Sequence, residues 1–221
     1  MNKKDILTKD LFNCEVPYLK DYFKESIYPW DLLPRIKDII EDLLDKGIPG
    51  FIKYKDGVLI GENVIIDNLS TINPPAIIGP NTVIRPGAYI RGNLITGANC
   101  VLGNSSEFKN AILLDHAEVP HFNYVGDSIL GNNAHMGAGS ICSNLKSDKK
   151  NIVIHSDIDI ETGLRKIGAI LGDNADIGCQ SVLNPGSIIG KNTRIYPLSM
   201  VRGVIPSNTI YKNKDNIVDR K

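Results

Sequence analysis

The stretch Ala76-Ile-Ile-Gly-Pro-Asn-Thr82-Val-Ile-Arg-Pro-Gly-Ala88-Tyr-Ile90 decides the fold of this chain, because isoleucines recur in it at a strict spacing of six. The same series reaches upstream through Ile60, Ile66 and Ile72. Neither the 3.6-residue period of a helix nor the two-residue period of a strand explains this spacing. A period of six predicts a solenoid whose hexapeptides form the sides of triangular coils and stack their isoleucines inward.

The ladder continues downstream with two slips of register and one interruption. We expect the next inward residues at Ile95 and Val101 after a slip of one. Later inward positions are predicted at Leu113, Val119, Val125, Leu130, Met136, Cys142, Leu171, Ile177, Leu183, Ile189, Ile195 and Val201. Residues 143–167 break the pattern, and their two short aliphatic runs around His155-Ser-Asp157 predict a projecting hairpin.

The N-terminal part has a different pattern. From Asp31 to Lys46 apolar residues follow the i, i+3, i+4 stripe of an amphipathic helix, with Asp31 as the expected N-cap and Gly47 as the stop. We expect residues 1–57 to form a helical cap over an exposed sheet edge, or alternatively an oligomer contact. We expect residues 58–203 to form the β-helix, and residues 204–221 to form a polar tail that lies along its outside or reaches a neighbouring subunit.

Composition excludes some partners. The 25 Lys and Arg residues balance the 25 Asp and Glu residues, which argues against nucleic acid as a ligand. No apolar run approaches the roughly 18 residues of a membrane span, so we expect no membrane contact. The four cysteines are far apart without a CxxC pair, as is typical of reduced thiols in the cytoplasm.

Several motifs resemble one family closely. They are Ile84-Arg-Pro-Gly-Ala88, Glu107-Phe-Lys109, His121-Phe-Asn-Tyr-Val-Gly-Asp127, Gly137-Ala-Gly139 and Asn144-Leu145. These strings resemble the acetyltransferase half of bacterial N-acetylglucosamine-1-phosphate uridyltransferase and of its archaeal sugar-1-phosphate nucleotidyltransferase relatives. Thr162-Gly-Leu-Arg-Lys166 and Asn184-Pro-Gly186 are closer to the archaeal branch. The resemblance implies an all-β, left-handed parallel β-helix of hexapeptide repeats, assembled as a homotrimer.

The resemblance also implies a reaction, the acetyl-CoA-dependent N-acetylation of an amino-sugar-1-phosphate, without a metal. Such a transfer needs a base for the amine proton and cations for the sugar phosphate. The family places its catalytic histidine at His121, and histidine is the residue type most often used as a general base. It implies substrate contacts from Arg85, Glu107, Lys109, Tyr124, His135, Asn144 and Lys150, and acetyl-CoA contacts from Ala138, Gly139, Arg165 and Lys166.

The chain departs from the family pattern at three points. It contains no Gly-rich nucleotide-binding stretch, so we expect no uridyltransferase half. His135 stands where the relatives have an asparagine. The second lysine that the archaeal branch has after the position of Lys150 is replaced by Val153 or lost to a gap.

Two other functions fit parts of the sequence. The altered His135 fits a non-catalytic scaffold that binds a sugar phosphate or nucleotide sugar. His116 and His121 have the spacing of two zinc ligands in trimeric β-helix carbonic anhydrases, but no histidine precedes His116 to supply the third ligand.

Overall fold

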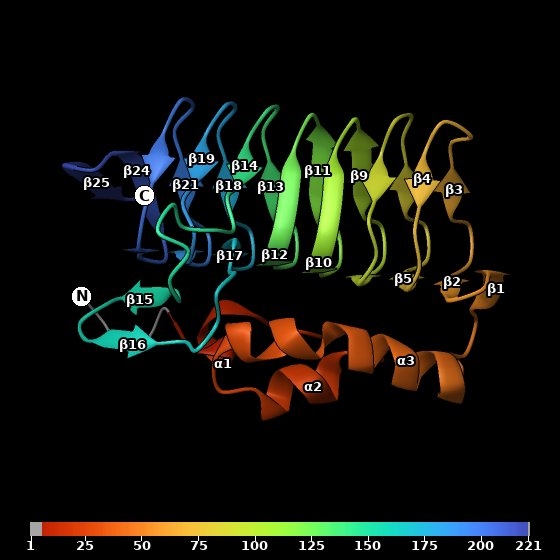
Figure 1. The fold of residues 1–221 in the computed structure, drawn as a ribbon. Helices are drawn as coiled ribbons and strands as arrows, with labels where there is room; N and C mark the ends of the chain where they lie inside the picture. The colour runs from red at the N-terminus through yellow and green to blue at the C-terminus, as the bar shows by residue number, and fades with distance from the viewer. Residues whose placement is uncertain (1–5, 221) are drawn as a thin grey trace.

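The computed structural model describes residues 6–220 of the 221-residue chain. Most of them form a left-handed parallel β-helix, and a smaller helical segment lies along one side of it (Figure 1). The predicted fold class, a hexapeptide β-helix with an N-terminal helical part, is confirmed. Residues 1–5 of the predicted cap lie outside the described residues.

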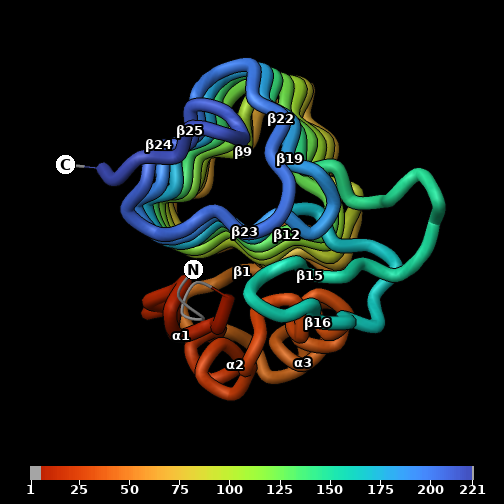
Figure 2. Tube along the Cα trace, turned by 90° about the vertical axis from the view of Figure 1, so that its left-hand side faces the viewer, coloured from red at the N-terminus to blue at the C-terminus, as the bar shows by residue number. Residues whose placement is uncertain are grey.

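Successive coils stack strand on strand into three faces, which give the outline seen along the axis in Figure 2. The covered face contains β2 (Val58–Ile60), β5 (Ala76–Ile78), β8 (Leu94–Thr96), β17 (Ala169–Leu171), β20 (Ser187–Ile189) and β23 (Val204–Ile205). The Tyr124 face contains β4 (Thr71–Ile72), β7 (Tyr89–Ile90), β14 (Ile141–Cys142), β19 (Val182–Leu183) and β22 (Met200–Val201). The β11 face contains β3 (Ile65–Ile66), β6 (Val83–Ile84), β9 (Val101–Asn104), β11 (Glu118–His121), β13 (His135–Met136), β18 (Asp176–Ile177), β21 (Arg194–Ile195), β24 (Thr209–Asn213) and β25 (Asn216–Asp219).

Two longer strands join the Tyr124 face to the covered face. β10 (Glu107–Leu113) and β12 (Tyr124–Leu130) pair in parallel on both sides of the corner between these faces. Each strand turns the corner at a residue with positive φ, Asn110 (52°) in β10 and Asp127 (48°) in β12. Asparagine and aspartate tolerate this left-handed conformation better than other non-glycine residues. The corner therefore stacks polar side chains from two neighbouring coils.

The inward ladder forms the core, but its register differs from the prediction at two positions. Leu102 and Phe108 are fully buried in the core of the β-helix, so the spacing of six continues without a slip from Ile90 through Thr96 to Phe108. The predicted inward positions of Ile95 and Val101 are therefore wrong. Thr96 occupies the inward position because its hydroxyl accepts a hydrogen bond from Gly79 N (2.8 Å), which satisfies a buried donor.

The covered face carries a second aliphatic ladder, which points outward. Six members are buried in a separate apolar cluster with the helical segment: Ile77, Ile95, Ile112, Ile129, Ile170 and Ile188. Leu59 and Val204, at the two ends of the series, are partly buried against this cluster. α3 packs against β8 and β10, and η2 packs against β12. The helical segment thus covers a flank of the β-helix (Figures 1 and 2). The expectation that it covers an open sheet edge is wrong.

The helical segment consists of α1 (Thr8–Leu11), α2 (Lys20–Glu25), η2 (Pro29–Arg35) and α3 (Ile36–Lys46). The sequence predicted one helix from Asp31, but residues 29–35 form a 3-10 helix and the α-helix starts at Ile36. Pro34 explains this start, because it has no N–H for an α-helical hydrogen bond. Asp31 instead accepts a hydrogen bond from Tyr28 N (3.1 Å).

Asp173 attaches the start of the helical segment to the β-helix. One carboxylate oxygen accepts hydrogen bonds from Asn132 N (2.9 Å) and Asn132 Nδ2 (3.0 Å), and the other accepts Asn13 N (2.8 Å). Asp173 N also donates to the carbonyl of Leu11 (3.0 Å). Because Asp173 is 7% exposed, these bonds are formed largely out of water.

An asparagine ladder lies along the corner between the covered face and the β11 face. Its members all have positive φ: Asn63, Asn81, Asn99, Asn133, Asn174, Asn192 and Asn208. Side-chain amides bond from coil to coil, as from Asn133 to Asn174 (3.1 Å) and from Asn174 to Asn192 (3.0 Å). His116 (φ 61°) occupies the ladder position between Asn99 and Asn133.

The insertion and the C-terminal part complete the fold. β15 (Val153–His155) and β16 (Asp159–Glu161) form an antiparallel hairpin within residues 143–167. β23 and β24 pair in parallel with β20 and β21, so the repeat continues beyond the predicted end at residue 203. β1 (Ile52–Lys55) leads into β2. Within residues 6–220, no helix has both the length and the apolar character that crossing a membrane requires.

Candidate functional site

His121 lies at the corner between the β11 face and the Tyr124 face. It ends β11, and the chain then turns through Phe122 (φ 53°) into β12. The side chain is exposed, and its ring has no hydrogen-bond partner among the residues that the structure describes. An unpaired, accessible imidazole is free to accept a proton from a substrate.

Asn123, which the sequence did not single out, fixes this corner. Its side-chain oxygen accepts a hydrogen bond from His121 N (3.0 Å), and its amide donates to the carbonyl of Gly137 in the next coil (2.8 Å). The His121 carbonyl accepts a hydrogen bond from Gly139 N (3.0 Å). Asn123 is 3% exposed, so these bonds hold the His121 backbone rigidly. The Gly139 N–H is committed to this bond, while Ala138 lies beside it in the same turn.

The opposite corner of the Tyr124 face is organised by Asp127. This carboxylate is 5% exposed and accepts hydrogen bonds from Lys109 Nζ (3.1 Å), Asn110 Nδ2 (3.0 Å) and Asn144 Nδ2. Asn144 Nδ2 also lies 3.2 Å from the Tyr124 hydroxyl. The predicted substrate residues Lys109, Tyr124 and Asn144 are thus brought together, around a carboxylate that the site prediction omitted.

The charges in this cluster are balanced. The Lys109 ammonium is paired with Asp127, so it is not a free cation for a phosphate group. Burial, and next the charge of Asp127, raise the pKa of Tyr124, which keeps its hydroxyl protonated near neutral pH. The cluster therefore presents a neutral phenol and an amide next to an ion pair.

Of the three other predicted contacts, Glu107 adjoins this cluster because it is in register with Tyr124 on the neighbouring strand, while Arg85 and Lys150 lie on other elements. Glu107, on the Tyr124 face, pairs with Arg91 (2.8 Å). Arg85 follows β6, which lies two strands from β11. Lys150 is exposed in the insertion, where its backbone N–H donates to Asp148 (3.1 Å). The structure therefore does not assemble the full predicted substrate set within one chain.

Arg165 and Lys166, the predicted acetyl-CoA residues of the insertion, lie near the Asp127 corner. Both are exposed and line a cavity of about 400 Å³, together with Asn110, Asp127 and three residues from the helical segment and the insertion. Ala138 and Gly139 lie at the other corner of the Tyr124 face. Within one chain, the four residues predicted to contact acetyl-CoA are thus divided between two corners of the Tyr124 face.

His135 is on the β11 face, where its Nδ1 lies 3.0 Å from Asp176 Oδ1. This hydrogen bond is the main cause of a raised pKa for His135 and a lowered pKa for Asp176. Both side chains are about half exposed. The pair joins two coils that are separated in sequence by the whole insertion.

The two histidines of the zinc alternative lie at opposite ends of one strand segment. His116 precedes β11 in the asparagine ladder, and His121 ends β11, so about 16 Å of extended chain separates them. Within residues 6–220, no three His, Cys, Asp or Glu side chains come together as metal ligands. His116 instead has the conformation that the ladder requires.

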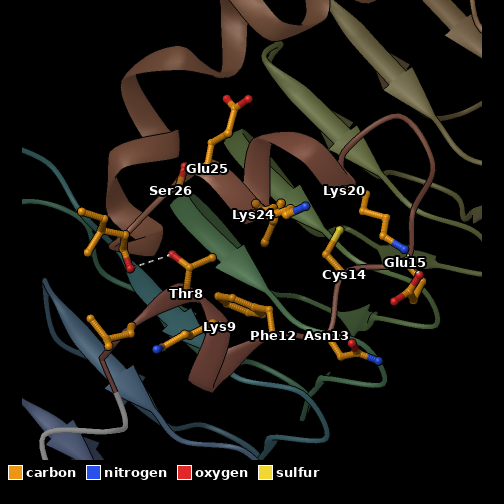
Figure 3. Close-up of a pocket in the computed structure, with 13 residues that line it drawn as sticks. Thr8, Lys9, Phe12, Asn13, Cys14, Glu15, Lys20, Lys24, Glu25 and Ser26 are labelled. Carbon is orange, nitrogen blue, oxygen red and sulfur yellow. Dashed lines mark hydrogen bonds and ion pairs between the residues drawn. The ribbon is translucent and has the colours of Figure 1, made fainter.

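A separate cavity of about 610 Å³ lies in the helical segment (Figure 3). Phe12 and Phe23 line it together with Lys9, Lys24 and the thiol of Cys14. Burial raises the pKa of Cys14 to about 12, so this thiol is not a nucleophile near neutral pH. None of the predicted site residues lines this cavity.

Comparison with known proteins identifies relatives over most of the chain. Residues 72–165 match the family described as "GMPPB C-terminal domain". The chain is 38% identical over 210 residues to the bifunctional protein GlmU of Methanococcus maripaludis, covering 92% of this chain and 50% of that protein. It is 28% identical over 213 residues to the bifunctional sugar-1-phosphate nucleotidylyltransferase/acetyltransferase of Sulfurisphaera tokodaii, covering 94% and 53%.

These GlmU proteins are homologues of the chain over most of its length. It spans about half the length of the curated relatives that it matches. Among solved structures it is similar to a point mutant of AntD, an N-acyltransferase from Bacillus cereus in complex with dTDP and coenzyme A, with 17% identity and a TM-score of 0.44. That likeness covers 79% of this chain and 92% of the AntD chain.

Proposed function

We propose that this chain is an acyltransferase that uses acetyl-CoA to N-acetylate an amino-sugar-1-phosphate, with His121 as the general base. The observation that carries the proposal is the His121 corner, where a rigid backbone presents an exposed imidazole without a hydrogen-bond partner among the residues that the structure describes. The names of the relatives, GlmU and a sugar-1-phosphate nucleotidylyltransferase/acetyltransferase, support the substrate class.

In the chemical step, His121 accepts the proton of the sugar amine. The sugar amine attacks the thioester carbonyl carbon, a C–N bond forms, and the imidazole takes the proton that the nitrogen loses. The tetrahedral intermediate then expels the thiolate as the C–S bond breaks, and the imidazolium returns a proton to that sulfur. Tyr124 and Asn144, as neutral donors, suit the hydroxyl or carbonyl groups of the sugar.

The site is completed by a second copy of the chain, in a homotrimer. Exposed apolar side chains follow the His121 corner and the adjoining column of the Tyr124 face: Leu69, Tyr89, Phe122, Ile141, Leu198 and Met200. Phe122, next to His121, is 64% exposed, and Leu198 is 81% exposed. A strip of this kind is typical of a protein interface. Sedimentation that shows only a monomer would contradict the trimer.

The decisive experiment measures release of free coenzyme A thiol with glucosamine 1-phosphate and its galacto epimer as acceptors. The His121→Ala variant should lower kcat by roughly 10²–10⁴-fold while leaving sugar-phosphate affinity nearly unchanged, as expected for loss of a general base. The His155→Asn variant, which changes a histidine of the hairpin, is the control.

Two outcomes would contradict this proposal in different ways. If sugar phosphates bind but no acceptor releases thiol, the chain is a binding scaffold. If His121→Ala keeps near-wild-type turnover, the enzyme is an acyltransferase with another base.

A further inference from the structure

Four charged side chains alternate in sign along the β11 face. Glu118, His135, Asp176 and Arg194 occupy equivalent positions on neighbouring strands, because Glu118 pairs with His135, His135 with Asp176 and Asp176 with Arg194. One carboxylate oxygen of Asp176 bonds to His135, and the other lies 3.8 Å from Nε of Arg194. The column therefore places one imidazole between two carboxylates.

The contact with Asp176 fixes how His135 is presented. Since the carboxylate only accepts hydrogen bonds, Nδ1 is the donor, and the other ring nitrogen, Nε2, is left for a ligand. The His135 side chain is 41% exposed, so a ligand can reach it. The hydrogen bond to Asp176, against a smaller effect of burial, raises the pKa of His135 and favours the imidazolium. The charge of Glu118 also raises the pKa of His135, while the charge of Arg194 lowers the pKa of Asp176.

Two other cations on the Tyr124 face are already paired. Lys109 is bound to Asp127 and Arg91 to Glu107. His135 lies within reach of the same substrate as His121, because it is in register with the residue three positions before His121 on the neighbouring strand. Strand rise and strand spacing place the two backbones about 11 Å apart. One amino-sugar phosphate together with the two imidazole side chains can span this separation.

We propose that His135, oriented by Asp176, is a specificity-determining residue that binds an oxyanion group of the acceptor whose amine His121 deprotonates. The inference rests on the proposed function and names the substrate feature that this chain selects. Two groups have this chemistry, the 1-phosphate itself and a carboxylate on the sugar ring, as in an amino uronic acid. The Nε2–H of an imidazolium forms a charge-assisted hydrogen bond with either group.

The test follows ligand binding at His135 directly by NMR of the imidazoles, which is practical because the chain has only four histidines. The probes are glucosamine, glucosamine 1-phosphate and glucosaminuronic acid. Affinity for the group that His135 binds should fall about tenfold as the pH rises through the pKa of His135, because the cation is lost. The carboxylate does not titrate in this range, whereas a phosphate monoester titrates near pH 6. The sugar amine titrates in all three probes, so glucosamine is the reference for its effect.

Variants separate the roles of the two side chains. His135→Asn should bind glucosamine unchanged but lose about tenfold affinity for the selected anionic probe and its pH dependence. Asp176→Asn should keep the imidazole but lower its pKa, moving the pH dependence to lower pH. His155→Asn is the matched control, because His155 forms the same kind of pair with Asp159 (2.8 Å) on the hairpin.

The inference and the proposed function fail differently. If His135→Asn binds every probe as the wild type does, the inference is overturned even when thiol release is normal. If binding depends on His135 but no acceptor is acetylated, the inference stands and the proposed acetyl transfer fails.

Discussion

Replacing His116 with asparagine should stabilise the protein without changing its activity. His116 interrupts the asparagine ladder between Asn99 and Asn133, and it already has the positive φ of that ladder. His116→Asn therefore adds no backbone strain and offers two new amide contacts, one to each neighbour. Existing contacts of this type are exposed and measure 2.9 to 3.2 Å.

The expected gain is modest. At the low end of the range for a net hydrogen bond, two exposed contacts contribute about 1 kcal/mol. For a chain of this size that free energy raises Tm by about 2–4 °C. The matched control is His116→Ala, which places an alanine at φ 61° and should cost about 1 kcal/mol.

The assay is thermal unfolding followed by circular dichroism at one protein concentration, together with thiol release. A Tm of His116→Asn equal to or below the wild type would refute the ladder argument. A hundredfold loss of turnover would instead place His116 in the chemistry, and the metal alternative would have to be considered again.

Three further changes test other parts of the structure. Asp173→Ala should lower the free energy of unfolding by about 2–4 kcal/mol in urea, because it removes a buried carboxylate that accepts hydrogen bonds from Asn13 N, Asn132 N and Asn132 Nδ2; an effect below about 1 kcal/mol would contradict its role in attaching the helical segment. Ile112→Ala, on the covered face, should cost about 2–5 kcal/mol, as for a core residue, although its side chain points out of the β-helix. Lys109→Ala should leave KM for glucosamine 1-phosphate within about threefold of wild type but lower kcat, because it leaves Asp127 buried without its counter-ion; a large rise in KM alone would return Lys109 to the role of phosphate ligand.

The hexapeptide period was sufficient to predict the fold class, and the errors lie where a second segment changes what is buried. Ile95 is buried because the helical segment covers it, so a search for inward residues selects it instead of Thr96. The outward series Ile77, Ile95, Ile112 and Ile129 recurs every 17 or 18 residues and was visible in the sequence. It shows that a flank of the β-helix is covered.

The sequence motifs identified Lys109, Tyr124 and Asn144 as site residues, and the structure brings these three residues to one corner. Their roles stay predictions. The pairing of Lys109 with Asp127 could not be predicted, because it depends on both long strands turning at the same height. His135 and Asp176 are 41 residues apart with the insertion between them, so no local pattern connects them.

The attachment of the helical segment along the covered face restricts how this repeat protein can evolve. In an uncovered solenoid a coil can be duplicated or deleted with little consequence for the others. Here α3 has 11 residues and so spans about 16 Å, the height of roughly three coils. An added coil beneath it would move the outward isoleucines away from their partners, and the Asp173 attachment would no longer meet Asn13. We therefore expect natural variation in coil number at the two ends of the β-helix, and a constant number of coils beneath the helices.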